Sequence, residues 1–270
     1  MQVNFSKTGE GNQPAPEITK KATETPVSEV VVESVNSSVP ALATRPNTFQ
    51  FGDDLPGFRE VKFPRINIVH NVGNLKDTFT PGEIVFGQTT VVFRPPIKDA
   101  AATPAVNFTV AGIVSKRFSE KVIGGIGGEI CDTEAEVRTA GGTTDYNEWK
   151  LKEKSGMKRF EPLNDMLIVI KRPAHVADDD TVFSFVIDGE KYALGLWSVK
   201  GTAYTAAYKE VLALHRLQGV LRGGYPMHSF SLSTRTKKFP TGLTWVPLVV
   251  PATKSSPAMI EFIKAIVNPQ

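Results

Sequence analysis

Cysteine is almost absent from this sequence: Cys131 is the only one among 270 residues. A single cysteine can form neither an intramolecular disulfide nor a cysteine-based zinc site, and the scarcity of cysteine favours a reducing compartment. The sequence also lacks an apolar run near the roughly 20 residues that cross a bilayer, and it lacks the basic-then-apolar plan of a signal peptide. We therefore expect a cytoplasmic protein without a membrane partner.

Motifs of known catalytic chemistry are missing as well. No Gly-x-Ser-x-Gly nucleophile elbow occurs, and Cys131 has no histidine near it in the sequence. The glycine cluster Gly124–Gly128 lacks the Gly-Lys-Ser/Thr ending of a nucleotide-binding P-loop. The four histidines are scattered, with no two at metal-ligand spacing. We expect no enzyme activity, no catalytic residue, no metal ion and no other cofactor.

Two short acidic patterns leave a metal-dependent alternative open. Asp53 or Asp54, followed by Glu60 and Lys62, resembles the acidic-x-Lys ending of metal-dependent nuclease sites. The run Asp178–Asp180 offers three further carboxylates, although a triple Asp before a strand is more often a solvated turn. The nuclease reading requires the carboxylates near Glu60 to converge in one cleft.

The first 48 residues differ in composition from the rest of the chain. They are rich in Pro, Ser, Thr, Glu and Lys, and Phe5 is the only aromatic residue before Phe49. Such a segment buries too little apolar area to offset the entropy cost of ordering, so we expect a flexible N-terminal arm over residues 1–48. Val30–Val32 leaves the alternative that the arm adds a strand to a neighbouring subunit. Residues 49–270 are expected to form a single β-rich domain.

The segment from Asp165 to Val249 reads in order as strand, hairpin, helix, hairpin. Asp165–Lys171 is an apolar run of strand length, and Thr181–Ser198 is two such runs joined at Asp188-Gly189, a strong hairpin signal. Gly201–Gln218 carries apolar and aromatic residues at helical spacing, with Thr202 as the expected N-cap and Gly219 after the last turn.

The last hairpin completes the order of an oligonucleotide-binding (OB) barrel. Met227–Arg235 and Leu243–Val250 are strand-like runs separated by a turn-rich stretch. An OB barrel has five strands in a partly open Greek key, with a helix between strands three and four. We expect a mainly β fold with a few helices, built on an OB-like core at about residues 160–250.

Further elements surround this expected core. Three or more extra strands precede it, in the Val-, Ile- and Phe-rich runs Val61–His70, Glu83–Phe93 and Val106–Phe118. Residues 119–160, punctuated by glycines, are expected to be a functional loop or an excursion from the sheet. Ser256-Pro257 should begin a C-terminal helix, since serine is a favoured N-cap and proline a favoured first helical residue.

Positive charge is concentrated in the expected helix and last hairpin. The whole chain carries a formal charge of +3, whereas the stretch Lys200–Lys238 carries seven Lys and Arg against Glu210 alone, a local net of +6. Single-stranded nucleic acid is held by basic grooves that follow the phosphates and by aromatic rings that stack on bases. The candidate phosphate contacts are Lys200, Arg222, Arg235, Lys237 and Lys238.

Strand alternation selects the candidate stacking residues. Tyr192, Leu194 and Leu196 share one face, expected to be core, so Trp197 falls on the opposite face with Lys191 and is the first candidate. Tyr192 becomes a candidate if the two faces are exchanged. Phe230 is a further candidate that could equally be core.

Two segments carry a resemblance to proteins encoded by tailed bacteriophages. These are Ile66–Phe86 and Asp188–Tyr204, followed by a Trp-Val-Pro strand and a Ser-Pro helix. The layout of residues 58–267 resembles phage-type single-stranded DNA-binding proteins. The resemblance implies DNA replication or recombination in the cytoplasm of a host cell, where the protein would coat and protect exposed strands. The chain ends in Ile266–Gln270, without the acidic tail that many such proteins use to recruit partners.

The sequence thus predicts a non-enzymatic protein that binds single-stranded DNA, with RNA also possible, as a homo-oligomer or cooperative assembly. A virion structural or assembly protein remains the alternative, because β-rich chains with a flexible arm suit lattices joined by strand exchange.

Overall fold

A computed structural model describes residues 62–97, 101–122, 128–214, 225–240 and 242–267. The chain divides after Arg45, and every described residue belongs to the unit Pro46–Gln270. The expected N-terminal arm, with Val30–Val32, and the acidic residues Asp53, Asp54 and Glu60 lie outside the described residues.

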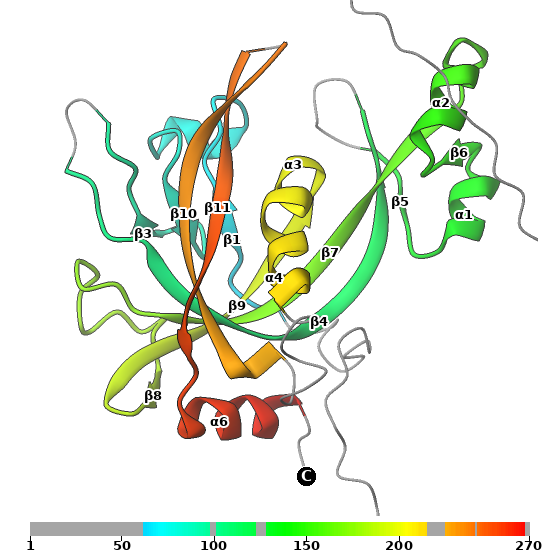
Figure 1. Ribbon diagram of the computed structural model, residues 1–270. Helices are drawn as coiled ribbons and strands as arrows, with labels where there is room; N and C mark the ends of the chain where they lie inside the picture. The colour runs from blue at the N-terminus through cyan, green and yellow to red at the C-terminus, as the bar shows by residue number, and fades with distance from the viewer. Residues whose placement is uncertain (1–61, 98–100, 123–127, 215–224, 241, 268–270) are drawn as a thin grey trace, which may run out of the picture. The chain divides into compact units, whose positions relative to one another are not determined.

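Two antiparallel sheets dominate the described part of the chain (Figure 1). The larger sheet has the order β11-β10-β4-β7-β9-β8, with β5 paired to β4 and the short β6 paired in parallel to β7. Its strands are β4 (Val106–Glu120), β5 (Ile130–Cys131), β6 (Gly142–Thr143), β7 (Lys158–Lys171), β8 (Phe185–Ile187), β9 (Glu190–Lys200), β10 (His228–Phe239) and β11 (Gly242–Lys254). The smaller sheet is β1 (Ile66–Ile68), β2 (Ile84–Phe86) and β3 (Thr90–Phe93).

The mainly β class is confirmed, whereas a closed five-stranded barrel is not. The larger sheet is open, because its order begins at β11 and ends at the three-residue β8 without a recorded pairing between them. Of the extra N-terminal strands, β4 joins the larger sheet, while β1–β3 form their own sheet, and the bridge Arg65–Leu196 and the packing of Phe86 on Gly195 connect it to β9. The fold therefore keeps the element order of the expected core without its closure.

The expected hairpin at Asp188-Gly189 is present. Asp188 and Gly189 both have positive φ angles, 51° and 77°, as the two central residues of a type I′ turn require. This turn joins β8 to β9 with the register Ile187–Glu190. The Asp-Gly hairpin signal predicts this turn correctly because the conformation of a two-residue turn and the twist of its strands depend on neighbouring residues alone.

The helices follow the expected order with one change at an N-terminus. The helix after β9 consists of α3 (Gly201–Ala203), a π turn η4 (Tyr204–Tyr208) and α4 (Lys209–Leu214). Its N-cap is Lys200 rather than Thr202, and no side chain caps it. The C-terminal helix α6 (Pro257–Val267) begins as expected, because the Ser256 Oγ accepts a hydrogen bond from the Met259 N–H at 3.2 Å. Residues 215–219 of the expected helix lie outside the described residues.

Helices cover both faces of the larger sheet. One hydrophobic cluster packs the α3–α4 helix and the smaller sheet against one face, and it includes Phe108, Trp197 and Phe230. A second cluster packs α6 against the opposite face and includes Leu167 of β7 with Met259 and Ile263 of α6. Figure 1 shows α6 below the sheet and the α3–α4 helix on its other side. Consequently neither face of the central strands is left open to solvent.

The segment 119–160 is an excursion from the sheet at the far ends of β4 and β7. This was one of the two alternatives expected, the other being a functional loop. It contains β5, α1 (Glu134–Thr139), β6, α2 (Tyr146–Lys152) and η3 (Glu153–Ser155), here called the α1–α2 lobe. The β4–β7 pairing shifts register near Val110 and Ile113, and such bulges bend strands. Figure 1 shows the two strands curving upward and carrying the lobe at their end. The described remainder adds two 3₁₀ turns, η2 (Asn74–Asp77) and η6 (Tyr225–Met227).

Among the described residues, no helix is both long and apolar enough to span a membrane.

Candidate nucleic-acid interface

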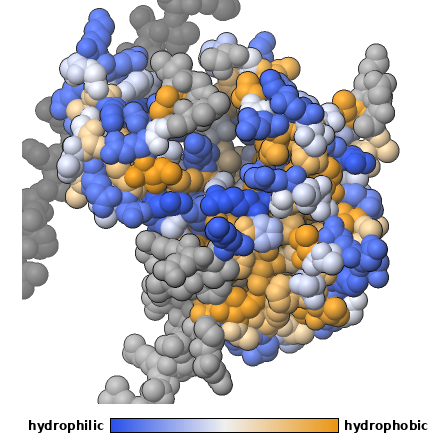
Figure 2. All heavy atoms as spheres, turned by 180° about the vertical axis from the view of Figure 1, so that it is seen from behind, coloured by the Kyte–Doolittle hydropathy of each residue, from blue (hydrophilic) through white to orange (hydrophobic). Residues whose placement is uncertain are grey.

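A groove of about 980 Å³ lies where the end of the β4–β7 pair, the α3–α4 helix and the β10–β11 hairpin meet. We call it the basic groove. Seen from behind, the surface is hollowed between the α1–α2 lobe and the rest of the unit, and hydrophilic atoms border that hollow (Figure 2). The side chains that define the basic groove in the following paragraphs are Lys121, Arg159, Glu161, Pro162, Tyr204, Lys209, Glu210, Arg235, Lys237, Val246 and Leu248.

The walls of the basic groove are positively charged. Five cations line it against two carboxylates, Glu161 and Glu210, so the lining carries a net charge of +3. Glu161 already pairs with two of these cations, with Lys121 at 3.0 Å and with Arg159 at 3.1 Å. Within the described part of the chain, the three cations on the helix and on β10 form no ion pair, so they remain available for an anion. They are Lys209, Arg235 and Lys237.

Two of these cations are placed by strand geometry. Arg235 and Lys237 are two residues apart on β10, so their side chains point to the same face, and the intervening Thr236 points away. Their partners in the β10–β11 register are Val246 and Thr244. Lys238 lies on the opposite face of β10 and does not line the basic groove.

The floor of the basic groove is apolar and aromatic. Tyr204 lies in the π turn η4, and its ring stacks on that of Tyr208 with centroids 4.9 Å apart and planes 26° apart. Burial raises the pKa of Tyr204, so its hydroxyl is neutral at physiological pH. Val246 and Leu248 of β11 complete the floor. Single-turn π segments are frequent at functional sites, which agrees with this position.

A second hollow of about 450 Å³ continues the basic groove past the start of α3. The two share Lys121, Glu161, Gly201 and Thr202. Lys200 lines this second hollow together with Trp245, whose ring packs so closely on Gly82 that a Cβ atom there would lie 2.7 Å from it. Trp245 therefore has a packing role, while Lys200 stands beside the basic groove.

Of the candidate phosphate contacts, the structure brings together Lys200, Arg235 and Lys237. Lys238 is exposed on the other face of the same strand. Arg222 lies outside the described residues.

Two aromatic candidates are corrected by the structure. Trp197 is 2% exposed and meets Phe108 edge to face at 5.7 Å, and Phe230 is 1% exposed and stacks on Phe108 at 5.5 Å. Strand alternation did place Trp197 opposite Tyr192 and Leu196, as expected. The prediction that Trp197 is exposed is wrong, because both faces of the larger sheet are covered. The face opposite Tyr192 and Leu196 therefore also packs into a hydrophobic core.

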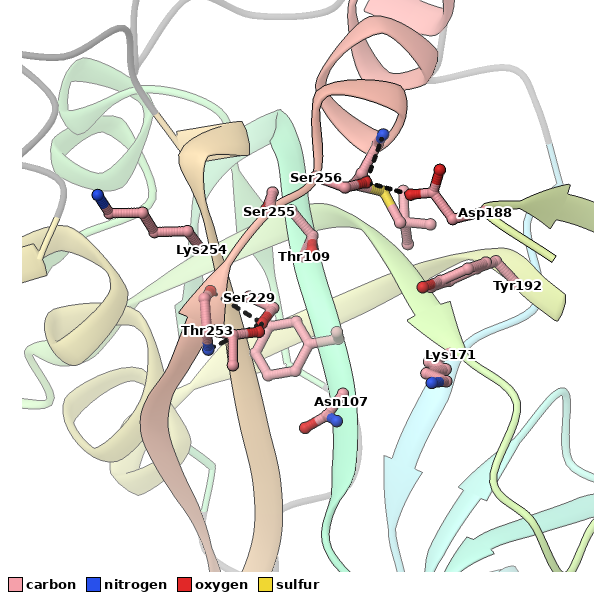
Figure 3. Close-up of a pocket in the computed structure, with 13 residues that line it drawn as sticks. Asn107, Thr109, Lys171, Asp188, Tyr192, Ser229, Thr253, Lys254, Ser255 and Ser256 are labelled. Atoms are coloured by element: carbon pink, nitrogen blue, oxygen red, sulfur yellow. Dashed lines mark hydrogen bonds between the residues drawn. The ribbon is translucent and has the colours of Figure 1, made fainter. Parts of the chain in front are cut away.

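Tyr192 and Lys191 lie away from the basic groove. Tyr192 lines a separate hollow of about 230 Å³ beside the start of α6, where Ser256 donates a hydrogen bond to Asp188 (Figure 3). Burial raises the pKa of Tyr192. Lys191 Nζ donates to the Asp178 backbone oxygen at 2.5 Å. Neither residue lines the basic groove.

The run Asp178–Asp180 serves local contacts. Asp178 pairs with Arg172 at 3.0 Å, and Asp180 accepts hydrogen bonds from Thr90 and from the Val182 N–H. Across the described ranges, no three His, Cys, Asp or Glu side chains are placed to hold a metal ion.

Sequence reasoning missed Lys121, Arg159, Tyr204 and Lys209 as groove residues. Lys121 and Arg159 are 38 positions apart, and they meet because the Lys121 N–H donates to the Arg159 carbonyl at 2.7 Å where β4 and β7 end. A sequence signal for Lys121 and Arg159 did exist: two long strand-like runs flank the glycine-rich segment, and pairing these runs with each other brings the two residues together. Tyr204 was expected only as one of the apolar and aromatic residues at helical spacing in Gly201–Gln218, and in the structure it is half-buried.

Comparison with protein-family models, with curated proteins and with solved structures finds no match. The chemistry of the basic groove is therefore the ground on which a function can be argued.

Proposed function

We propose that this protein binds single-stranded DNA in the basic groove and does so without catalysis. The observation that carries the proposal is the combination of unpaired cations on the walls with an apolar, aromatic floor. Proteins that hold single strands without sequence preference combine these same two ingredients. RNA shares the relevant chemistry, so it remains a second ligand to test.

The two ingredients have separate roles. Lys209, Arg235 and Lys237 contact phosphates, because no described carboxylate pairs with them. Bases lie on Tyr204 and on the apolar side chains of β11, where stacking is worth about 1–3 kcal/mol per base. Bases in a duplex are paired and stacked inside the helix, so they cannot reach the floor. A preference for single strands follows.

The proposal is tested by fluorescence-anisotropy titration of a labelled oligonucleotide of about 30 residues, single-stranded and then duplex, at two salt concentrations with EDTA present. We expect salt-sensitive binding with a clear preference for the single strand, and an RNA of the same sequence measures the sugar preference. Binding to neither strand form would overturn the proposal. Because EDTA removes divalent cations, binding in its presence also separates this function from the metal-dependent alternative.

Reversing two charges on β10 gives a sharper test of where the strand binds. We expect Arg235→Glu with Lys237→Glu to weaken single-strand affinity by about tenfold or more, because two phosphate contacts become repulsive. The slope of log K against log salt should fall in magnitude by about 1.4, at about 0.7 per lost contact.

Lys238→Glu is the matched control for this pair. It reverses a charge on the same strand, next to Lys237, but on the face that does not line the basic groove. The control should change affinity by less than about twofold. If Lys238→Glu weakens binding as much as the double variant, the strand binds by the general charge of the hairpin rather than in the basic groove.

A role in subunit assembly is the second candidate, and exposed apolar side chains at the sheet edges favour it. Val186 on the edge strand β8 is 66% exposed, and Leu243 and Val250 on the edge strand β11 are also exposed. Exposed edges of this kind are sites of strand addition between subunits. Self-association without nucleic acid, measured by analytical ultracentrifugation, would support this candidate.

A further inference from the structure

Two aromatic rings on α2, the exposed Tyr146 and the half-buried Trp149, form a cation-bracketed surface on the α1–α2 lobe. The ring centroids of Tyr146 and Trp149 are 5.7 Å apart, and Tyr146 is 53% exposed. The Arg159 guanidinium lies over both rings, at 5.0 Å from the first and 5.3 Å from the second. Lys150 Nζ lies 5.5 Å from the Trp149 ring. We call these two rings the α2 platform.

The α2 platform does not form the core of the lobe. That core is a separate small cluster of Cys131, Val137 and Phe160, with Phe118 and Ala140 packed against it. Large aromatic side chains usually contribute most of the packing energy of a small lobe. Here they stand outside it, so packing of the lobe does not account for their position.

Contacts at the first turn of α2 hold the platform in place. Asp145 caps the helix by accepting the Glu148 N–H at 2.9 Å. Glu148 accepts hydrogen bonds from Arg138 at 2.6 Å, from Thr143 at 2.8 Å and from Lys152, and these lower its pKa to about 2. Glu148 therefore stays ionised at physiological pH, and the rings are presented on a fixed helix.

Arg159 connects the α2 platform to the basic groove. The same side chain lines the basic groove, pairs with Glu161 and covers both platform rings. The stretch from Glu148 to Arg159 also carries five Lys and Arg against two Glu, a net charge of +3. Lys150, Lys152 and Lys158 of this stretch pair with glutamates, so Arg159 is the cation that joins the wall of the basic groove to the rings.

We infer that a single strand leaving the basic groove passes Arg159 and stacks a base on the α2 platform. The ligand class is an unpaired nucleobase within a single-stranded nucleic acid, and the inference rests on the proposed function. Every base has a π face, so such a platform adds affinity without sequence preference. Arginine beside aromatic rings adds a cation–π contribution and a phosphate contact. The platform therefore extends the site beyond the basic groove.

Oligonucleotide length separates the platform from the basic groove. We would titrate the wild type and a Tyr146→Ala/Trp149→Ala variant with thymidine oligomers of about 6 and about 20 nucleotides, the shorter within and the longer beyond the site sizes of about 4–16 nucleotides of OB-type domains. The variant should bind the longer oligomer about tenfold or more weakly, because stacking is lost. It should bind the shorter oligomer, which the basic groove holds alone, within about twofold of the wild type.

Leu151→Ala is the matched control, since Leu151 is exposed on the same helix outside the platform, and it should alter neither affinity. A second readout does not depend on truncation: Trp149→Phe should keep the affinity but remove the part of the tryptophan quenching that the longer oligomer causes and the shorter one does not, since Trp245 beside the basic groove is exposed to both oligomers.

The outcomes are distinct. A wild type that binds neither oligomer overturns the proposed function and this inference together. A wild type that binds both, with a double variant that is unchanged or that loses both equally, leaves the proposed function standing and overturns the platform. If the longer oligomer still quenches Trp149→Phe more than the shorter one does, to the same extent as in the wild type, the platform is also overturned.

Discussion

Replacing Trp197 with alanine should lower the free energy of unfolding by about 3–5 kcal/mol, the usual cost of removing a large buried aromatic side chain. Trp197 is 2% exposed, meets Phe108 edge to face and lies in the larger hydrophobic cluster beside Met166 and Val199. Truncation removes the apolar burial of the indole and leaves a cavity that neighbouring strands cannot fill. Urea denaturation followed by circular dichroism measures the effect.

The same variant separates a core residue from a stacking residue. If Trp197 stacked on DNA, as strand alternation alone suggested, its removal would leave stability nearly unchanged and weaken binding. We expect the reverse: lower stability, with DNA affinity of the folded protein retained under conditions where the variant is folded. Trp197→Phe should lose less stability than Trp197→Ala, because it keeps a ring against Phe108. A stable Trp197→Ala protein would contradict the packing described here.

Replacing Asp165 with alanine should cost about 2–3 kcal/mol of stability, since it removes a buried carboxylate that accepts three hydrogen bonds, one of them from the partly exposed Arg117. Asp165 is 3% exposed and accepts hydrogen bonds from Ser198 at 2.5 Å, from Ser115 at 2.7 Å and from Arg117 at 2.5 Å. The variant leaves two hydroxyl groups and the guanidinium without this partner. Thermal and urea unfolding measure the loss.

The pH dependence gives this prediction a sign. Burial by itself raises the pKa of Asp165, but the hydrogen bonds from Ser198 and Ser115 and the charge of Arg117 outweigh it, so the pKa lies below its ordinary value of 3.8. A carboxylate whose pKa is lowered in the folded state contributes its full stabilisation at any pH above its ordinary pKa. That stabilisation is lost as the pH falls through the pKa of the folded state. Wild-type stability should therefore decline below about pH 4.

Asp165→Asn is the control for the pH effect. It keeps the shape of the side chain and removes the titration. Below pH 4 the stability of the variant should therefore fall less steeply than that of the wild type, and the two slopes should differ by up to about 1.4 kcal/mol per pH unit. Parallel pH profiles for the wild type and Asp165→Asn would show that Asp165 is not the group whose protonation destabilises the fold.

Local sequence rules located most of the elements. The Asp188-Gly189 turn, the Ser256-Pro257 helix start and the strand–hairpin–helix–hairpin order depend on neighbouring residues, and all three are present in the structure. The N-cap at Thr202 was wrong, because the chain enters the helix directly from β9 and Lys200 takes that position. Local rules also cannot say whether a sheet closes, and this one stays open.

The basic groove was predictable in part. Arg235 and Lys237 follow from the charge of the last hairpin, whereas Lys121 and Arg159 required the pairing of β4 with β7. The sequence could not show that Lys237 lines the basic groove and Lys238 does not. Which face of β10 borders the basic groove depends on the position of the α3–α4 helix.

The sequence by itself determined where strands, turns and helices form, because propensity, periodicity and capping act over a few residues. It also determined that positive charge gathers between Lys200 and Lys238. Only the tertiary structure decided which side chains are exposed. Trp197 became core because a second layer covers its face, and Arg159 became a surface contact between the basic groove and the α2 platform because two distant strand ends meet. Burial depends on what packs across a sheet, and that information is spread over the whole chain.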